Sequence, residues 1–372
     1  MSWFWYVTVH VGGCVVWRCS HEAIKRVFYT QALSRLFQFS STTLRVVWRQ
    51  PAPSKTIRFM SAASRRDDDD YLTRPNTTHF ITIIYDNGRL GNRMFQYAVL
   101  LGFARRTHRQ PIVDCDGRLS PMYPRIAAEC TPHAGKRFAK LAPSEQHLKL
   151  KGKLQVGRIL NARENNITIV SFEFRHLIRP WGDFRNMSHI IRRQFQLSTN
   201  ATALASDFMT SLIVRYKRNA NVTGDVTPIA LHVRRGDFLS SSSIAVGRPV
   251  ATPHYFYNAM TYFRQRYANC LFIVASDDAR WCRKHLLARD VMLIADHKLN
   301  STVKFRDEVE RDVSVLRLVE HSILSSDSTF SWWIGWFTPG EVVYYRKPRA
   351  QNETYLYVRD NDFYLSRWKE MT

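Results

Sequence analysis

The sequence lacks an apolar run long enough to identify a membrane-spanning helix directly. Its best candidate, residues 3–17, is interrupted by Thr8 and His10 and closed by Arg18. As a helix this run would be roughly 22 Å long, short of the roughly 30 Å hydrocarbon core of a bilayer. No Lys or Arg precedes it, and the basic start and small-residue cleavage site of a secretory signal are also missing. Residues 1–19 therefore predict only a short membrane anchor, and an incorrect start site is the alternative.

Acidic residues are scarce relative to basic ones. The sequence has 31 Asp and Glu against 54 Lys and Arg, which gives a formal net charge of +23. Such an excess favours an anionic partner or an anionic surface. The chain nevertheless has no dense basic tract and no recognisable nucleic-acid-binding module. Phosphate groups on a ligand, or acidic glycans at a membrane, are sufficient anions, so we predict that nucleic acid is not the partner.

Cysteine is also infrequent, with six in the chain, two of them within the first 19 residues. The other four are Cys115, Cys130, Cys270 and Cys282. Four cysteines allow three pairings, and loop length favours the local pairs Cys115–Cys130 and Cys270–Cys282. Two disulfides would indicate an oxidising compartment. Buried free thiols are the alternative, because Cys270 and Cys282 flank a predicted core strand and helix.

Seven Asn-x-Ser/Thr sequons favour the same compartment, since this density is high for a cytosolic chain. The candidate N-glycosylation sites are Asn76, Asn166, Asn186, Asn200, Asn221, Asn300 and Asn352.

The most informative motif is His232-Val-Arg-Arg-Gly-Asp-Phe238, which directly follows a short apolar run. That run, Pro228–Leu231, predicts a buried parallel strand. Open α/β sheets bind ligands at the carboxyl ends of their strands, and two adjacent guanidiniums offer paired donors to an anion such as a diphosphate. Because side chains alternate along a strand end, only one arginine should point into the cleft with His232. A basic surface turn paired with Asp237 is the alternative.

A strand, a glycine-containing loop and a helix are predicted earlier in the chain. Thr82–Tyr85 is rich in β-branched and aromatic residues, Gly88 and Gly91 follow, and residues 94–104 have apolar residues at helical spacing. This order directs backbone N–H groups and a helix start toward a ligand anion. The Gly-x-x-Gly spacing alone is a weak signal, because such turns are common in α/β proteins.

Two further strand ends carry polar residues. Leu271–Ala275 precedes Ser276-Asp-Asp278, and a short strand at 322–324 precedes Ser328-Thr-Phe-Ser-Trp-Trp333. With the Gly-x-x-Gly-Asn-x-Met-Phe-Gln-Tyr and His-x-Arg-Arg-Gly-Asp-Phe blocks, the chain resembles the α-1,2-fucosyltransferase family, the galactoside 2-fucosyltransferases of glycosyltransferase family 11. The four blocks occur in the family's order and span roughly two thirds of the chain.

The resemblance implies an α/β fold of the GT-B type, with two facing Rossmann-like lobes and the donor site between them. It also implies transfer of L-fucose from GDP-β-L-fucose to the 2-hydroxyl of a glycan, a β-galactoside on a glycoprotein or glycolipid. The expected reaction inverts the sugar to an α-1,2 linkage and needs no metal or other cofactor. Animal members are type II Golgi membrane proteins with a luminal catalytic domain, which is the localisation the resemblance implies.

The pattern along the chain agrees with two lobes. Residues 20–78 are irregular and basic, which predicts a disordered stem or linker. Residues 79–225 form the predicted amino-terminal lobe, with further strands at 110–114 and 168–172. Residues 226–372 alternate strands with helices, as in a parallel doubly wound sheet, and form the predicted nucleotide-sugar lobe.

Site roles follow from the resemblance, residue by residue. Arg234 is implied to be the catalytic phosphate ligand that stabilises the leaving GDP. Arg235, the other candidate donor-binding arginine, would then pair with a carboxylate. Asp312, on the last long helix, is implied to hold the guanine. His232 is implied to share the cleft with Arg234, and Ser328 and Thr329 would donate to phosphate or fucose. The other candidate donor-binding residues are Gly88, Arg89, Gly91 and Asn92, on the fucose side.

Several assignments stay open between two roles. Asp237 is the candidate general base, because it is the only carboxylate in the strongest motif. Its alternative role is to orient an arginine through a salt bridge, and the departing phosphate could also accept the proton. Asp277 and Asp278 are expected to be a helix N-cap and its neighbour. Trp332 and Trp333 are expected in the core and not as a sugar platform.

Other functions remain as alternatives. A nucleotide-sugar-binding relative without turnover would keep the donor site, and a nucleic-acid-binding protein would use the net charge. A metal-dependent glycosyltransferase would use paired carboxylates to bridge a divalent cation to the diphosphate. The candidate carboxylates for that case are Asp114 and Asp116, after an apolar strand, and Asp360 and Asp362.

Overall fold

The computed structural model divides the chain into two units, Met1–Ser61 and Ala62–Thr372, which we describe separately. It describes residues 4–10, 14–20, 79–84, 88–115, 119, 121–131, 147–151, 169–173, 182, 184–245, 247–325, 328–346 and 363–372.

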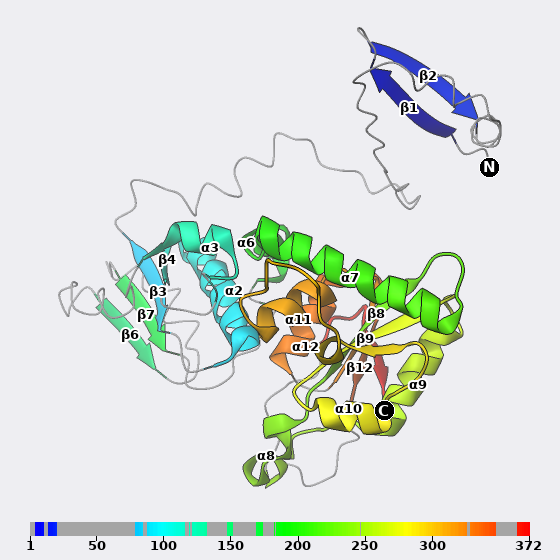
Figure 1. The fold of residues 1–372 in the computed structure, drawn as a ribbon. Coiled ribbons are helices and arrows are strands. Elements are labelled where there is room, and N and C mark those ends of the chain that lie inside the picture. The colour runs from blue at the N-terminus through cyan, green and yellow to red at the C-terminus, as the bar shows by residue number, and fades with distance from the viewer. Residues whose placement is uncertain are drawn as a thin grey trace. The chain divides into compact units, whose positions relative to one another are not determined.

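In the first unit, strand β1 (Phe4–His10) pairs antiparallel with β2 (Cys14–Ser20) (Figure 1). The described residues of the predicted anchor are therefore in strands, and both strands are rich in the β-branched and aromatic residues that favour this structure. Among the residues described, no helix combines the length and the apolar character needed to cross a membrane. Membrane attachment through residues 1–19 stays a prediction, and the predicted stem, 20–78, lies outside the described residues apart from Ser20.

The amino-terminal lobe of the second unit contains a parallel sheet in the order β5–β4–β3–β7–β6. Its elements are β3 (Phe80–Ile84), α2 (Leu90–Thr107), β4 (Gln110–Asp114), α3 (Pro124–Glu129), β5 (Cys130–Thr131), β6 (His147–Lys151) and β7 (Ile169–Glu173). The three strands predicted from sequence in this lobe are confirmed to within one or two residues. Helix α2 is apolar on nearly all sides and correspondingly buried, because it packs against β3, β4 and the other lobe.

The carboxyl-terminal lobe contains a six-stranded parallel sheet in the order β10–β9–β8–β11–β12–β13. Its strands are β8 (Thr227–Val233), β9 (Cys270–Ser276), β10 (Val291–Leu293), β11 (His321–Leu324), β12 (Val342–Tyr345) and β13 (Lys369–Met371). Its helices are η6 (Gly236–Leu239), α8 (Ser241–Ala245), α9 (Pro253–Arg264), α10 (Ala279–His285), η7 (Ile294–Asp296), α11 (Glu308–Leu316) and α12 (Thr329–Phe337). The strand order reverses between β8 and β11, which creates the topological switch point where such sheets bind ligands.

The segment between the two sheets contains η5 (Arg185–Met187), α6 (Ser188–Gln194) and α7 (Thr199–Ala220). Although α7 precedes the predicted lobe boundary at residue 225, it packs against α11 of the second lobe (Figure 1). Ser198 caps α7 by accepting a hydrogen bond from the backbone N–H of Ala201. The two α/β lobes of the GT-B type expected from sequence are thus present.

Strand β8 separates two hydrophobic cores and so decides where its last side chains point. Ile229, Leu231 and Val233 pack with α9 and α10 on one face, whereas Ala230 belongs to the core on the other face. This alternation is the period-two geometry of a buried strand. Continued past Val233, it directs Arg234 to the α12 face and Arg235 to the α10 face.

The core expectation for the tryptophan pair is confirmed. Trp332 and Trp333 are each 1% exposed, and the ring of Phe95 from α2 lies 4.6 Å and 5.1 Å from theirs. The indole N–H of Trp333 donates to the carbonyl of Gly91 at 3.0 Å. These side chains therefore join the two lobes and do not form a sugar platform.

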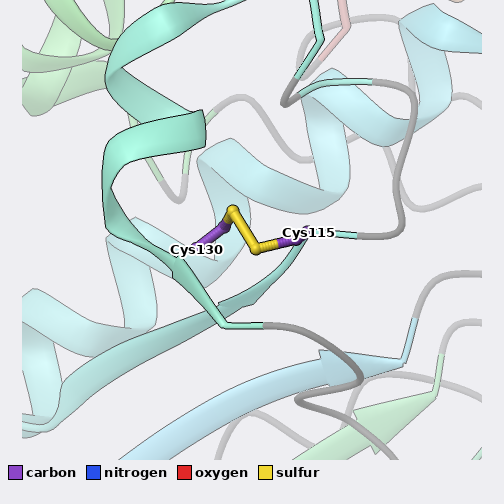
Figure 2. Close-up of a disulfide and its surroundings, with 2 residues drawn as sticks. All are labelled: Cys115 and Cys130. Carbon is purple, nitrogen blue, oxygen red and sulfur yellow. A yellow bond between two sulfur atoms is a disulfide. The ribbon is translucent and has the colours of Figure 1, made fainter.

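One predicted disulfide is confirmed and the other is wrong. Cys115, just after β4, is bonded to Cys130 at the start of β5, with their Cα atoms 5.0 Å apart (Figure 2). Cys270 and Cys282 are buried free thiols. Cys270 opens β9, whereas Cys282 in α10 is hydrogen-bonded to Ser276 at the other end of that strand, which lies about 20 Å from Cys270 at the usual rise of a strand. Proximity in sequence was therefore misleading, because a whole strand separates the two sulfurs.

Candidate active site

A cavity of about 810 Å³ lies at the switch point of the second sheet and is lined by residues of both lobes. Ten residues predicted from sequence line it: Gly88, Arg89, Gly91, Asn92, His232, Arg234, Asp237, Asp312, Ser328 and Thr329. Arg235 does not line it. The residues selected from sequence therefore lie together around one cavity, and the structure shows that Arg234 lines it whereas Arg235 does not.

The two adjacent arginines have different surroundings. Arg234 faces the cavity, and its guanidinium forms ion pairs with Asp237 and, at 2.7 Å, with Asp277. Arg235 turns to the other face, where it pairs with Asp278 at 3.3 Å and stacks on the ring of Trp281 at 4.1 Å. The expectation that one arginine points in and the other is structural is confirmed.

Asp278 caps helix α10 as expected, by accepting a hydrogen bond from the backbone N–H of Trp281. Asp277 was expected to be only its neighbour, but it lines the cavity, pairs with Arg234, and accepts the backbone N–H of Arg235 at 2.9 Å. Strands β8 and β9 are in register, so that the residues following Val233 and Ser276 lie opposite each other. Carrying the alternation of both strands one residue further would have revealed this pair.

Gly236 is required by the same ion pairs. A Cβ atom at this position would lie 2.5 Å from the Oδ2 atom of Asp277. Glycine therefore lets the backbone pass against the carboxylate that holds Arg234.

His232 is buried behind Arg234 and joined to a chain of serine hydroxyls. Its Nδ1 lies 2.6 Å from Ser331 Oγ, which lies 3.2 Å from Ser325 Oγ. Ser325 Oγ also accepts the backbone N–H of Arg234 at 3.0 Å. The hydroxyl protons are all satisfied if Ser325 donates to Ser331 and Ser331 donates to Nδ1. We infer from this order that the single N–H of the neutral ring is on Nε2, away from the serines.

The charge state of His232 follows from its position. Burial, and then the neighbouring Arg234 cation, lower the pKa of His232 to about 3. The ring is therefore neutral near pH 7, and it can donate a hydrogen bond without adding a positive charge. The fixed cations of the cavity must come from guanidiniums.

The glycine loop of the first lobe contacts the start of α12 in the second. A Cβ atom on Gly91 would lie 2.6 Å from the backbone nitrogen of Phe330. Next to it, Asn92 Oδ1 accepts a hydrogen bond from the hydroxyl of Thr329 at 2.8 Å. Ser328 is the N-cap of α12, accepting from the N–H of Ser331. Gly91 and Asn92 therefore hold the lobes together at the cavity as well as lining it.

Three carboxylates in and just before α11 line the cavity: Asp307, Glu308 and Asp312. Burial raises the pKa of Asp312 to about 6, and Arg311, at 2.9 Å, opposes this shift. Asp307 caps α11 through the backbone N–H of Glu310 at 2.8 Å, so its position has a structural cause.

Sequence reasoning missed several residues of the cavity. These are Pro121, Met122, Phe238, Arg248, Ser276, Asp277, Arg306, Asp307, Glu308 and Phe330, among others. Pro121 and Met122 lie in the loop that the Cys115–Cys130 disulfide closes. Arg248 follows the short helix α8, and no motif marked it. Phe238, Ser276, Asp277 and Phe330 lie within recognised blocks but were given no donor-binding role, and the sequence carried no signal for the other positions.

The remaining predicted positions that the structure describes are not among the residues that line the cavity. Among the described residues, no group of three or more His, Cys, Asp or Glu could hold a metal ion. Asp114 is described, whereas Asp116, Asp360 and Asp362 lie outside the described residues. Four sequons, at Asn186, Asn200, Asn221 and Asn300, are exposed, and those at Asn76, Asn166 and Asn352 are not described.

The two parallel α/β lobes, with a strand-end guanidinium facing the cavity between them, are the architecture of a GT-B glycosyltransferase. The model of the family described as "Glycosyl transferase family 11" matches residues 54–372. The chain belongs to this family, which confirms the resemblance found in the four sequence blocks.

Among its relatives is galactoside alpha-(1,2)-fucosyltransferase 1 of Sus scrofa, 27% identical over 298 residues, covering 77% of this chain and 73% of the relative. The Oryctolagus cuniculus protein of the same name is 23% identical over 320 residues, covering 86% and 80%. Similar solved structures include an Arabidopsis thaliana FUT1 mutant in complex with GDP, with 13% identity, a TM-score of 0.45, and coverage of 78% and 76%. Another is fucosyltransferase NodZ from Bradyrhizobium, with 14% identity, a TM-score of 0.41, and coverage of 71% and 95%. At these scores neither structure defines the site.

Proposed function

We propose that this glycosyltransferase moves L-fucose from GDP-β-L-fucose to the 2-hydroxyl of a β-galactoside, with inversion and without a metal ion. The observation that carries the proposal is the placement of Arg234, fixed by two carboxylates at the switch point of a nucleotide-binding sheet. Membership of glycosyl transferase family 11 supports the reaction class, and the names of the relatives support the donor sugar and the acceptor.

The mechanism follows from where charge develops. Departure of GDP places negative charge on the β-phosphate, and a cation already fixed in place stabilises that charge without reorganising. Asp277 holds Arg234 at 2.7 Å, and the hydrogen bond from the Arg234 backbone to Ser325 fixes its base. The neutral His232 and the start of α12 would add N–H donors to the phosphate or the sugar. Asp312, once ionised, would accept the N–H groups of the guanine.

Asp237 is engaged by Arg234, so the structure supports the positioning role that was the alternative to the general base. We propose that Asp237 orients the guanidinium and that the departing phosphate accepts the proton of the acceptor hydroxyl. Replacement Asp237→Asn separates the roles. If Asp237 is the general base, its replacement should remove the acidic limb of the pH–rate profile. If it is a positioning residue, its replacement should lower the rate and leave the shape of the profile unchanged.

The compartment is part of the same proposal. A disulfide between Cys115 and Cys130 supports a catalytic unit that works in an oxidising lumen. The four exposed sequons agree with it. We propose a Golgi membrane protein with a luminal catalytic domain, to be tested by fluorescence localisation and by digestion with an N-glycosidase.

The deciding experiment incubates the purified chain with GDP-fucose and a panel of β-galactosides, with and without EDTA, and determines the linkage of the product. An α-1,2-fucosylated product formed in EDTA is expected. Donor binding without transfer or donor hydrolysis would instead identify a binding relative. Activity lost in EDTA and restored by Mn²⁺ would identify a metal-dependent enzyme, with Asp114 and Asp116 as the first ligands to replace.

A further inference from the structure

The guanidiniums that line the cavity differ in how far neighbouring carboxylates offset their charge. The guanidinium of Arg234 lies between two carboxylates, those of Asp237 and Asp277, so this cluster carries one excess negative charge. An excess negative charge repels an anionic ligand. Arg234 alone therefore cannot supply the attractive field that binds a diphosphate.

The other lining guanidiniums differ in their partners. Arg306 pairs with Asp307 at 3.5 Å. Arg89, at the start of α2, is exposed. Arg248 is partly buried at the cavity and forms no ion pair with any residue in the described part of the chain. It is thus a cation whose charge is not already offset.

Arg248 is held next to Arg234 by a shared aromatic ring. Its Cζ atom lies 5.0 Å from the centroid of Phe238, and that of Arg234 lies 5.7 Å from the same centroid. Phe238 is 4% exposed, so the ring is a fixed surface. Stacking on such a face holds a guanidinium flat while its N–H groups stay available.

Hydrogen bonds in the segment before Arg248 fold the chain back toward Phe238. The N–H of Arg248 donates to the carbonyl of Ser243 at 3.0 Å, and the Ser243 hydroxyl donates to the carbonyl of Asp237 at 2.7 Å. The segment from η6 through α8 therefore returns to its own start and brings the Arg248 side chain back to Phe238. No sequence motif required this return.

We propose that Arg248 is a second ligand of the donor's diphosphate, which offsets the excess charge of the Arg234 cluster. The inference rests on the proposed function and adds to it a specific phosphate contact. Removing Arg248 should weaken the binding of ligands that carry a diphosphate and leave the binding of the nucleoside unchanged.

The test measures the dissociation constants of GDP and of guanosine for the purified chain at one pH and ionic strength, by calorimetry. Arg248→Ala should weaken GDP binding roughly 10- to 100-fold, the usual effect of losing a charge-assisted hydrogen bond, and leave guanosine binding as in the wild type. Arg266→Ala is the matched control, because Arg266 also stacks on a ring, that of Tyr262 at 3.8 Å, but does not line the cavity. Arg248→Gln, which keeps most of the apolar stem, replaces the alanine variant if the latter melts at a lower temperature.

Wild-type GDP affinity in the Arg248 variants would overturn this inference alone. An equal loss of GDP and guanosine binding would also overturn it, since the residue would then act on the base or through the fold. A wild-type chain that binds no GDP would overturn the proposed function and this inference with it.

Discussion

The two lobes contribute to the cavity in different ways. The carboxyl-terminal lobe supplies nearly all of its charged side chains, among them Arg234, Asp277 and Asp312. The amino-terminal lobe supplies one charged residue, Arg89, together with the backbone near Gly91 and the loop containing Met122. This contrast indicates that chemistry resides in the second lobe, whereas the first lobe sets the shape of the cavity. Substitutions of the charged cavity residues in the second lobe should therefore change turnover, whereas substitutions in the first lobe should act through stability and the shape of the cavity.

The largest effect is expected from Arg234→Lys. A single ammonium cannot reproduce the planar fork that two carboxylates hold in place, and losing a preorganised donor lowers the rate roughly 10²- to 10³-fold. Fucose transfer and the melting temperature should be measured together, and the melting temperature should change little. Arg235→Lys is the paired variant: it should melt lower, since it loses the stack on Trp281, but keep measurable turnover. Equal rate losses at unchanged stability would show that both guanidiniums act on the diphosphate.

In the first lobe, removing the Cys115–Cys130 disulfide should reduce stability and not chemistry. Closing a loop with a sequence separation of 15 residues stabilises the folded state by about 3 kcal/mol in the chain-entropy description. Cys115→Ser/Cys130→Ser should therefore unfold at lower denaturant, with near wild-type turnover in the folded fraction. Reductant should lower the melting temperature of the wild type and leave that of the double variant unchanged. A large loss of turnover at full folding would instead make the loop containing Met122 part of the chemistry.

A smaller loss is expected for Gly91→Ala. The added methyl group would lie 2.6 Å from the backbone nitrogen of Phe330, so α2 and α12 must separate, which typically costs about 1–3 kcal/mol. Thermal melting and donor KM should both be affected, because this contact joins the lobes at the cavity. Gly182→Ala is the control, since nothing lies within 4 Å of its Cβ position. Melting at the wild-type temperature would show that the lobes can move apart freely.

The smallest effect should be a pH dependence of donor binding. Burial raises the pKa of Asp312 to about 6, so this carboxyl becomes protonated as the pH falls from 7 to 5. In the role that we propose for it, it would then no longer accept the guanine N–H groups. GDP-fucose affinity should fall roughly tenfold over that range, and GDP-fucose is the suitable probe because its diphosphate does not titrate there. His232, with a pKa of about 3, stays neutral throughout. Asp312→Asn should remove the pH dependence, and its persistence would assign the titration to another group.

Protonation of Asp312 should weaken donor binding, but it should increase the stability of the folded protein. The pKa of Asp312 in the folded state is raised above its ordinary value of 3.8, so between pH 3.8 and about 6 the folded protein binds more protons than the unfolded one. This group therefore makes the protein less stable as the pH rises through that window. His232 acts in the other direction, since its lowered pKa makes the protein less stable as the pH falls below 6.5.

Much of the site could be predicted because it is built from local patterns. The strand at 228–231, the glycine loop and the helix cap at Asp278 are each determined by a few adjacent residues, and the alternation of side chains along a strand is enough to separate Arg234 from Arg235. The incorrect disulfide, Cys270–Cys282, shows the limit of such reasoning. Both cysteines lie close in sequence, but a fully extended strand holds them apart.

What the sequence by itself determined was the order of elements, the family, and the strand end at His232–Phe238 that lines the cavity. What only the tertiary structure decided was which distant residues meet there. Asn92 and Thr329, which are 237 residues apart, share a hydrogen bond. Asp277 meets Arg234 through the register of two strands, and Arg248 reaches Phe238 because an irregular segment folds back on itself. The periodicity of a helix or strand depends on neighbouring residues and can be recognised in the sequence. The register between strands, and the way a segment folds back on itself, depend on how all of the elements pack together.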